Sequence, residues 1–245
     1  SYRDYLIAKG LVGSSVSRVI SSIKAVFNFA ISEYALDLKN PFIGMYFNRS
    51  TGVSKRLPIP VEDILKVQQK CCLIDDDLRW LVTLISDTGM RLAEGAGLLK
   101  GDIILDADIP HISLKPHPWR SLKTSGSQRD IPLVGASLWA AQRLSEAFPD
   151  NPYAFPRYNR KDITNSNSAS AALNKWLHHY VPNGCTMHSF RHSMRDRLRA
   201  VECPSDVIDQ IGGWATEGVG QGYGEGYSIE VCLKWVNKLD VFDRV

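Results

Sequence analysis

Six side chains, spread over five short clusters of the sequence, are of the types that bind and attack a phosphate group. Two are arginines, whose planar guanidinium donates parallel hydrogen bonds to phosphate oxygens and stays charged at any working pH. These types suit metal-free cleavage of a phosphodiester, in which a hydroxyl attacks phosphorus and fixed cations stabilise the developing negative charge. In chain order the six are Arg91, Lys123, His188, Arg191, Trp214 and Tyr223.

The surroundings of the two arginines favour this interpretation. Arg91 follows Gly89, which can relieve a tight turn, and Glu94 comes one helical turn later, where its carboxylate can orient the guanidinium. Arg191 lies three residues after His188, so both point the same way if a helix begins there. The alternative for Arg91 is a solvated arginine at a helix end.

Strand cleavage also needs a base and an acid. His188 is the candidate base because the reference pKa of histidine lies near neutrality, whereas His192 is assigned a supporting structural role. Lys123 lies between two expected strands and is the candidate acid for the leaving 5′ oxygen, if the site lowers its pKa. Lys115 is the rival for that role. The ordinary alternatives are a capping histidine and a surface lysine.

Tyr223 is the candidate nucleophile, nine residues after Trp214, and Tyr227 is the alternative. A phenol has a reference pKa of about 10, so it needs a base and cationic partners to attack phosphorus. The Trp214 indole either donates to a phosphate oxygen or only packs. Glycine occupies every second position from 218 to 226, which opposes a regular helix by roughly 4–5 kcal/mol. We therefore expect Tyr223 on a mobile loop.

The elements that must position these residues are mostly helical. Apolar residues recur at three- and four-residue steps from Val16 to Tyr34, which is typical of an amphipathic helix. Short apolar runs between Ile103 and Leu133 predict a small antiparallel sheet, and Pro132 confines the last run to an edge or strand end. Further helices are expected at about 61–72, 78–86, 136–147, 167–180, 188–200, 204–212 and 228–238.

The order and spacing of the clusters resemble the tyrosine recombinase (phage integrase) family over nearly the whole chain. The resemblance implies that Tyr223 attacks the scissile phosphate, which forms a 3′-phosphotyrosine and frees a 5′ hydroxyl. It further implies that the phosphoryl oxygens are held by two arginines and the indole, with Lys123 as acid and His188 as base, and that neither a metal nor a cofactor is used. The implied oxygen-holding residues are Arg91, Arg191 and Trp214.

The same resemblance implies a fold, a domain order and partners. The fold class is mainly α with a small antiparallel β-sheet (α+β), with a partial helical core-binding (DNA-binding) domain at 1–50, a basic linker at 51–60 and a catalytic domain at 61–245. The partner is double-stranded DNA. Assembly into a tetramer is expected on DNA, from a monomer or weak oligomer, with accessory DNA-bending proteins as further candidates. The segment after Tyr223 is expected to pack against a neighbouring protomer.

Composition narrows the class of protein without identifying it. The 245 residues are 44% hydrophobic and carry a net charge of only +3, so DNA binding must depend on where the charge lies. Five cysteines without a Cys-x-x-Cys pair argue against a zinc site and a disulfide framework, and favour a cytoplasmic protein. The family resemblance implies that it is bacterial and nucleoid-associated. No membrane span is expected. Basic clusters supply the DNA-binding candidates Arg56, Arg120, Arg129, Arg157, Arg160, Lys161 and Arg195.

Two other functions stay open at this point. A type IB topoisomerase-like enzyme would relax DNA with a similar set of residues, normally as a monomer. A DNA-binding assembly protein would keep the fold and lack catalysis, although the intact six-residue set speaks against that reading. A metal-dependent nuclease would need a carboxylate cluster, and none has persuasive spacing.

Overall fold

The computed structural model describes residues 1–46, 48–52, 57–161, 163–214 and 226–242. The chain divides into two compact units, an N-terminal unit at Ser1–Lys55 and a C-terminal unit at Arg56–Val245. The division falls within the linker predicted at 51–60. No helix in the described ranges is both long and apolar enough to cross a membrane.

The N-terminal unit is a pair of helices with a very small core. Helix α1 (Tyr2–Ala8) begins at a capping box formed by Ser1 and Asp4, and α2 (Gly13–Glu33) follows after a short turn. The buried apolar side chains of this unit are Leu6, Val16 and Ile20. Several larger apolar side chains along α2 and after it are exposed, as expected when two helices bury only one stripe.

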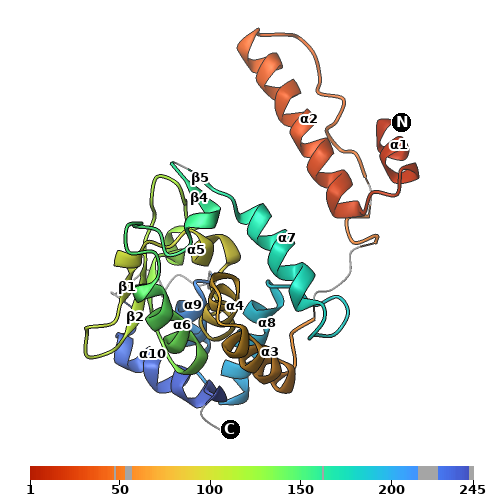
Figure 1. Ribbon diagram of the computed structural model, residues 1–245. Coiled ribbons are helices and arrows are strands. Elements are labelled where there is room, and N and C mark those ends of the chain that lie inside the picture. The colour runs from red at the N-terminus through yellow and green to blue at the C-terminus, as the bar shows by residue number, and fades with distance from the viewer. Residues whose placement is uncertain (47, 53–56, 162, 215–225, 243–245) are drawn as a thin grey trace. The chain divides into compact units, whose positions relative to one another are not determined.

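The C-terminal unit is built around α4 (Asp77–Thr88), every residue of which is buried from Leu81 to its end. Helices α3 (Val61–Ile74), α6 (Gly135–Glu146) and α8 (Ser189–Ala200) pack against it (Figure 1). A helix enclosed on several sides is apolar around most of its circumference, and this explains the buried cluster of Leu81, Val82, Leu84 and Ile85. The predicted helices 61–72, 78–86, 136–147 and 188–200 are confirmed within two residues.

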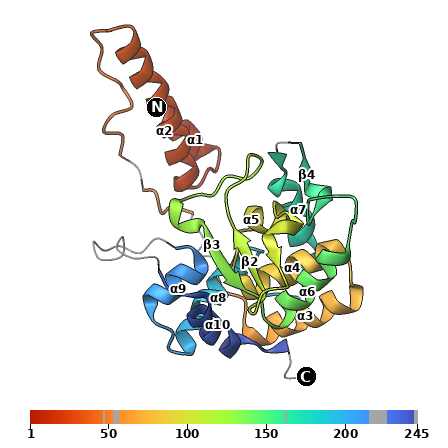
Figure 2. The ribbon, with the colours of Figure 1, turned by 90° about the vertical axis from the view of Figure 1, so that its left-hand side faces the viewer.

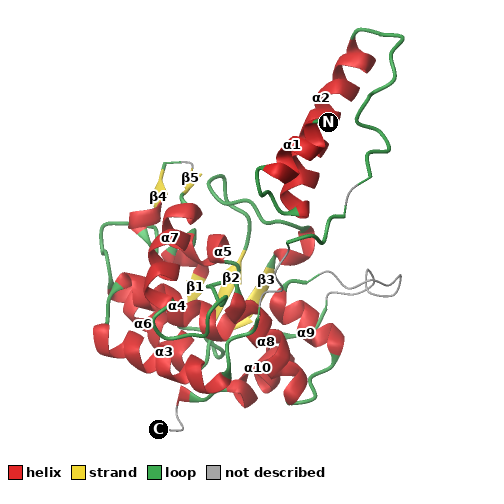
Figure 3. Cartoon of the chain, turned by 90° about the vertical axis from the view of Figure 1, so that its right-hand side faces the viewer, coloured by secondary structure: helices red, strands yellow, loops and turns green. Residues whose placement is uncertain are grey.

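A small antiparallel sheet, yellow in Figure 3, flanks this helical core. Its strands are β1 (Ile103–Ile104), β2 (His111–Leu114) and β3 (Arg129–Pro132), in the order β1-β2-β3. Ile112 pairs with Ile131, and both are buried. Strand β3 is an edge strand that ends at Pro132, as the sequence predicts. The mainly α fold with a small antiparallel sheet is therefore confirmed.

The last helices of the unit share a second core with α8. Helix α9 (Ser205–Gly212) and α10 (Ile229–Val236) both contact β3, as Figure 2 shows. Cys232 and Val236 of α10 are buried against side chains of α8 and α9. In this single chain α10 packs on its own unit. The packing of the segment after Tyr223 on a neighbouring protomer stays a prediction.

A buried ion pair fastens α8 to α4. The Arg197 guanidinium donates to Asp87 Oδ1 at 3.1 Å and to the carbonyls of Ser86 and Leu239. The remaining elements are α5 (Leu92–Ala96), α7 (Ser166–Leu177), β4 (Asn159–Arg160), β5 (Ile163–Thr164) and the 3-10 turns η1 (Lys100–Asp102), η2 (Ser125–Ser127), η3 (Pro156–Tyr158) and η5 (Asn237–Leu239).

Candidate active site

The end of α4 sets the position of Arg91. Gly89 closes the helix in the left-handed conformation, with φ +61°, and a Cβ there would lie 2.9 Å from Met194 Cγ. Arg91 then caps α5, where the Glu94 carboxylate accepts from its backbone N–H at 2.9 Å and also from its guanidinium. The predicted pairing of Arg91 with Glu94 is therefore present, and it fixes both the backbone and the side chain.

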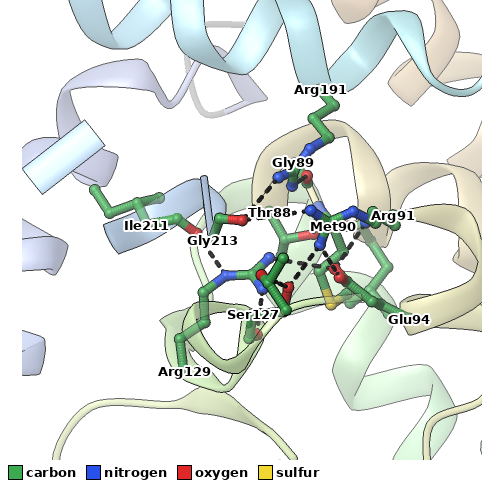
Figure 4. Close-up of polar contacts among 12 residues, drawn as sticks. Thr88, Gly89, Met90, Arg91, Glu94, Ser127, Arg129, Arg191, Ile211 and Gly213 are labelled. Atoms are coloured by element: carbon green, nitrogen blue, oxygen red, sulfur yellow. Dashed lines mark hydrogen bonds and ion pairs between the residues drawn. The ribbon is translucent and has the colours of Figure 1, made fainter. Parts of the chain in front are cut away.

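Arg191 reaches the same place from α8. Its Nη1 donates to the Gly89 carbonyl at 2.8 Å and its Nη2 to the Gly213 carbonyl at 3.3 Å. Arg91 Nη2 donates to that same Gly213 oxygen at 3.5 Å, so the two guanidiniums meet at one acceptor (Figure 4). Only 4% of Arg191 is exposed. The two arginines predicted to share a pocket are thus brought together, although they are 100 residues apart in sequence.

The Gly212-Gly213-Trp214 turn closes this pocket. Gly213 has φ +60° and follows the last residue of α9. The Trp214 ring lies directly against Gly212, where a Cβ would come within 1.7 Å of ring atom Cζ3. That ring stacks beside two guanidiniums, at 4.4 Å from Arg191 and 5.0 Å from Arg195. The tandem glycines therefore allow an indole to lie against the arginine site.

Gly212→Ala is expected to displace Trp214, because the added methyl overlaps its ring. We predict a loss of about 1–3 kcal/mol in stability from overpacking, and about a tenfold slower DNA cleavage because the cation–π contact is lost. The measurements are thermal unfolding and the cleavage rate. Gly101→Ala is the matched control, since nothing lies within 4 Å of a Cβ at that position. Equal behaviour of the two variants would show that the indole is not held in this way.

Positive charge exceeds negative charge in the described part of the pocket. Arg91, Arg129 and Arg191 gather around the one carboxylate of Glu94. Burial, followed by the charges of Arg91 and Arg129, lowers the pKa of Arg191 to about 9. Burial alone would raise the pKa of Glu94, but the charge of Arg129 and the hydrogen bonds from Arg91 outweigh it and lower that pKa. A pocket of this kind gains stability when an anion enters it.

Inorganic phosphate is therefore expected to raise the melting temperature of the protein. At ten times its dissociation constant, a bound anion adds about 1.4 kcal/mol, which corresponds to roughly 3–6 °C in a chain of this size. Thermal unfolding in phosphate and in chloride of equal ionic strength measures the effect. Arg191→Met should retain the general salt effect but lose the specific increment. An identical increment in both proteins would place the anion elsewhere.

The loop that carries Lys123 is tied to Arg91. Lys123 itself is exposed, and the next residue, Thr124, shares a 2.9 Å hydrogen bond with the Ser127 hydroxyl. Ser127 Oγ in turn accepts from Arg91 Nη1 at 3.0 Å. The rival, Lys115, has its ammonium 3.8 Å from the buried carboxylate of Asp102. Lys123 is therefore the lysine whose neighbours reach the arginine pocket.

Both predicted histidines lie at the start of α8. His188 is exposed at the N-cap position, and its backbone carbonyl accepts from the Arg191 N–H at 3.1 Å. The rings of His188 and His192 lie 5.3 Å apart in an edge-on arrangement. His188 thus lies on the same helix turn as Arg191 and is exposed to solvent.

Tyr223 lies outside the described residues, but its alternative Tyr227 is placed. The Tyr227 backbone N–H donates to Gln210 Oε1 at 2.7 Å, and its carbonyl accepts from Gln210 Nε2 at 2.6 Å. The Tyr227 hydroxyl donates to Asp206, and that hydrogen bond raises the pKa of the phenol. A nucleophilic phenol needs the opposite shift, so these contacts favour an anchoring role for Tyr227.

The DNA-binding candidates separate into buried and exposed groups. Arg120 and Arg129 are only 3% and 7% exposed and donate to protein acceptors, which corrects their prediction as surface contacts with DNA. Basic residues that are close in sequence suggested a charged surface patch. In the fold, these two guanidiniums instead donate to buried carbonyls and carboxylates of neighbouring segments. Arg195 is half-buried and paired with Asp209 at 3.0 Å. Arg56 lies outside the described residues, and the exposed candidates are Arg157, Arg160 and Lys161.

Two polar groups of the pocket were not predicted from the sequence. Ser127 connects Arg91 to the Lys123 loop, and Arg129 contacts Glu94 from β3. A serine in a turn gives no sequence signal for a role in this site. An arginine at the start of a strand with apolar residues could have suggested that its side chain is buried. Among the residues that the structure describes, no group of three or more His, Cys, Asp or Glu side chains could hold a metal ion.

Comparison with known proteins identifies relatives of both sequence and fold. A family model described as "Phage integrase family" matches residues 60–225, a span that includes all six candidate positions. No curated protein sequence is similar enough to be matched to this chain. The Tn1549 transposon integrase in complex with circular intermediate DNA has a TM-score of 0.59 at 18% identity, covering 90% of this chain and 81% of that one.

Two phage proteins share the fold at lower identity. A lambda integrase dimer bound to a COC′ core site has a TM-score of 0.60 at 14% identity, over 93% of this chain and 80% of that one. The integrase from mycobacterium phage Brujita has a TM-score of 0.55 at 13% identity, over 96% of this chain and 76% of that one. At such low identity, these similarities show a shared fold. The roles of individual side chains rest on the geometry described above.

Proposed function

The chain belongs to the phage integrase family, and from that premise we propose that it cuts and rejoins DNA strands through a covalent bond between Tyr223 and a 3′ phosphate. It is a site-specific DNA recombinase, an enzyme that transfers strands. The observation that carries the residue assignment is the meeting of Arg91 and Arg191 at the single Gly213 carbonyl, in a pocket with surplus positive charge.

The negative charge of a DNA phosphate would complement the surplus of positive charge around Glu94. Guanidiniums held by buried carbonyls and a carboxylate do not reorganise when charge develops on phosphoryl oxygens, which is the condition for strong electrostatic stabilisation. A guanidinium has five N–H donors, so Arg91 and Arg191 would each donate to those oxygens while keeping the contacts with Gly213 that hold them in place. Trp214, stacked beside Arg191, would border the same phosphate. This arrangement would lower the energy barrier of phosphodiester cleavage, because negative charge develops on the phosphoryl oxygens in the transition state of that reaction.

The proposed reaction has two balanced steps. The Tyr223 oxygen forms a bond to phosphorus as the bond to the 5′ oxygen breaks, with the phenol proton passing to His188 and Lys123 protonating the leaving oxygen. The product is a 3′-phosphotyrosine and a free 5′ hydroxyl. A 5′ hydroxyl then attacks phosphorus, the tyrosine leaves, and the two protons return. No external energy source is needed, because the phosphotyrosine keeps the bond energy.

DNA and further copies of the chain are the proposed partners. Lambda integrase, which shares this fold, has been solved as a dimer bound to a core site and as a tetramer bound to a Holliday junction. We propose the same kind of tetramer on DNA here, in the bacterial cytoplasm, for an integrase of a prophage or another mobile element. The N-terminal unit would then serve as a partial core-binding domain, and the exposed basic residues Arg157, Arg160 and Lys161 would contact the DNA backbone.

A trapping experiment tests this function. The protein first selects its own site from a random-sequence duplex pool, and that site is then made with a nick beside the cleavage position and a 5′ label on the cleaved strand. We expect a labelled protein adduct on a denaturing gel, formed equally with and without EDTA. DNA binding without any adduct would favour an assembly protein. Relaxation of supercoiled DNA that lacks the selected site would favour the topoisomerase-like reading.

A further inference from the structure

Arg129, at the start of β3, makes three hydrogen bonds to three separate parts of the fold. Its Nε donates to the Ile211 carbonyl at 2.8 Å, its Nη1 to the Ser127 carbonyl at 2.6 Å, and its Nη2 to Glu94 Oε2 at 3.4 Å. These acceptors belong to α9, to the turn η2 and to α5. A single buried guanidinium therefore joins the sheet to three segments that are far apart in sequence (Figure 4).

Each acceptor of Arg129 stands next to a residue of the phosphate pocket. Glu94 holds the Arg91 guanidinium, and Ser127 accepts from that same guanidinium through its hydroxyl. Ile211 precedes the Gly212-Gly213 turn, whose Gly213 carbonyl accepts from both catalytic arginines. Moving the Arg129 side chain would therefore disturb the support of Arg91 and the closing turn together.

The space around Arg129 leaves little freedom for it to move. A Cβ at Gly213 would lie 2.6 Å from Arg129 Nη1, so the guanidinium packs directly beneath that glycine. The side chain is almost fully buried, and its Nε, Nη1 and Nη2 atoms each donate to a protein acceptor. It therefore has no surface from which to grip the DNA backbone, and any effect on the reaction must pass through its neighbours.

We propose that Arg129 is a positioning residue for strand cleavage, which locks the Arg91–Glu94 pair, the Lys123 loop and the Gly213 turn into one arrangement. The inference rests on the function proposed above and concerns the same site. It assigns to a buried side chain a role that neither the charge pattern nor the family match points out.

The electrostatic part of this role concerns Glu94. That carboxylate faces Arg91 from its own helix start, Arg129 from β3, Arg120 from the loop after β2 and Arg191 from α8. Burial raises the pKa of Glu94, and the charge of Arg129 is the largest influence opposing it. Without that charge the Glu94 pKa rises, and a protonated Glu94 no longer holds Arg91 as an ion pair.

Two variants separate the charge from the geometry. Arg129→Met removes both, and Arg129→Lys keeps the charge but cannot span three acceptors. On the self-selected nicked duplex we expect the cleavage rate at saturating DNA to fall about 10²-fold in Arg129→Met, as for a misplaced catalytic group, and about tenfold in Arg129→Lys. DNA affinity should change by less than about threefold, because no DNA contact is lost.

The dependence of the cleavage rate on pH distinguishes the two roles, because a purely structural role would leave it unchanged. In Arg129→Met the ratio of variant to wild-type rate should rise with increasing pH, as the Glu94 carboxylate regains its ionised form. Taking the ratio cancels any dependence on pH that both proteins share. In Arg129→Lys the ratio should be independent of pH, since a cation still faces Glu94.

Arg197→Met is the matched control for destabilisation. Arg197 is also a buried guanidinium in an ion pair, but its partners are Asp87 and the carbonyls of Ser86 and Leu239. We expect it to lower the melting temperature at least as much as Arg129→Met, without a pH-dependent change in the cleavage ratio. If Arg129→Met does not fold, Arg129→Lys carries the test through its rate at saturating DNA.

The outcomes distinguish this inference from the proposed function. If the wild-type protein forms no adduct, the proposed function fails. If it does, and Arg129→Lys cleaves at the wild-type rate, the positioning role is wrong. A ratio for Arg129→Met that does not vary with pH would overturn the electrostatic part. If weaker DNA binding accounts for all of the slower cleavage in Arg129→Met, Arg129 is a DNA-binding residue and not a positioning residue.

Discussion

Tyr223→Phe is expected to abolish the covalent protein–DNA adduct, whereas Tyr227→Phe leaves it in place. Phenylalanine keeps the ring but has no oxygen to attack phosphorus, so the loss should be complete within detection. Tyr223 lies outside the described residues, and the distinction rests on Tyr227. Its hydroxyl is engaged by Asp206, which raises its pKa, and its backbone is held on α9 by Gln210.

The measurement is the labelled adduct on a denaturing gel, with DNA binding followed in parallel. Tyr223→Phe should bind the selected duplex as the wild-type protein does, because removing one hydroxyl removes no phosphate contact. Tyr227→Phe should slow adduct formation only modestly, through a looser anchor. The reverse pattern, with the adduct lost in Tyr227→Phe alone, would move the nucleophile to Tyr227.

Arg191→Met is expected to lower the rate of strand cleavage at saturating DNA by about 10²–10³-fold, the usual result of losing a preorganised donor to a developing oxyanion. Stability should fall by no more than about 1–3 kcal/mol, the cost of leaving the Gly89 and Gly213 carbonyls without this donor, because burial also makes the charge itself unfavourable. The lowered pKa of Arg191 marks it as such a charge. Slow cleavage in a stable protein is the signature of a residue kept for function.

Arg195→Met is the matched control for Arg191→Met. It lies one helical turn further along α8 and also faces the Trp214 ring, but it is partly exposed and paired with Asp209. We expect cleavage at saturating DNA to stay within about fivefold of wild type, because such a pair contributes about 1 kcal/mol or less. Single-turnover cleavage and thermal unfolding measure both variants. Equal losses would mean that proximity to Trp214, rather than the phosphate, explains the effect.

Much of the fold could be predicted from the sequence because its periodicity is regular. The long stripe after Val16 and the short apolar runs around Ile112 gave the correct element types. The hairpin of β4 and β5 was missed, since its strands are two residues long and polar at Arg160. Too few residues alternate there for a period to be read.

The candidate site was predicted in part, and the reason differs from residue to residue. Arg91 and Arg191 were assigned correctly to one pocket because their flanking residues form motifs. Arg120 and Arg129 were misread, since a count of local charge does not tell which guanidiniums meet buried acceptors. Burial depends on contacts such as that between Arg129 and Ile211, which are 82 residues apart.

The measurement that tests the central claim most directly is the chemical identity of the DNA–protein bond. The trapped adduct is digested with protease and nuclease, and the modified peptide is sequenced by mass spectrometry. The account predicts a nucleotide joined through its 3′ phosphate to Tyr223, formed by the wild-type protein and not by Arg191→Met within the same reaction time. A nucleotide on any other residue, or a linkage through a 5′ phosphate, would contradict it.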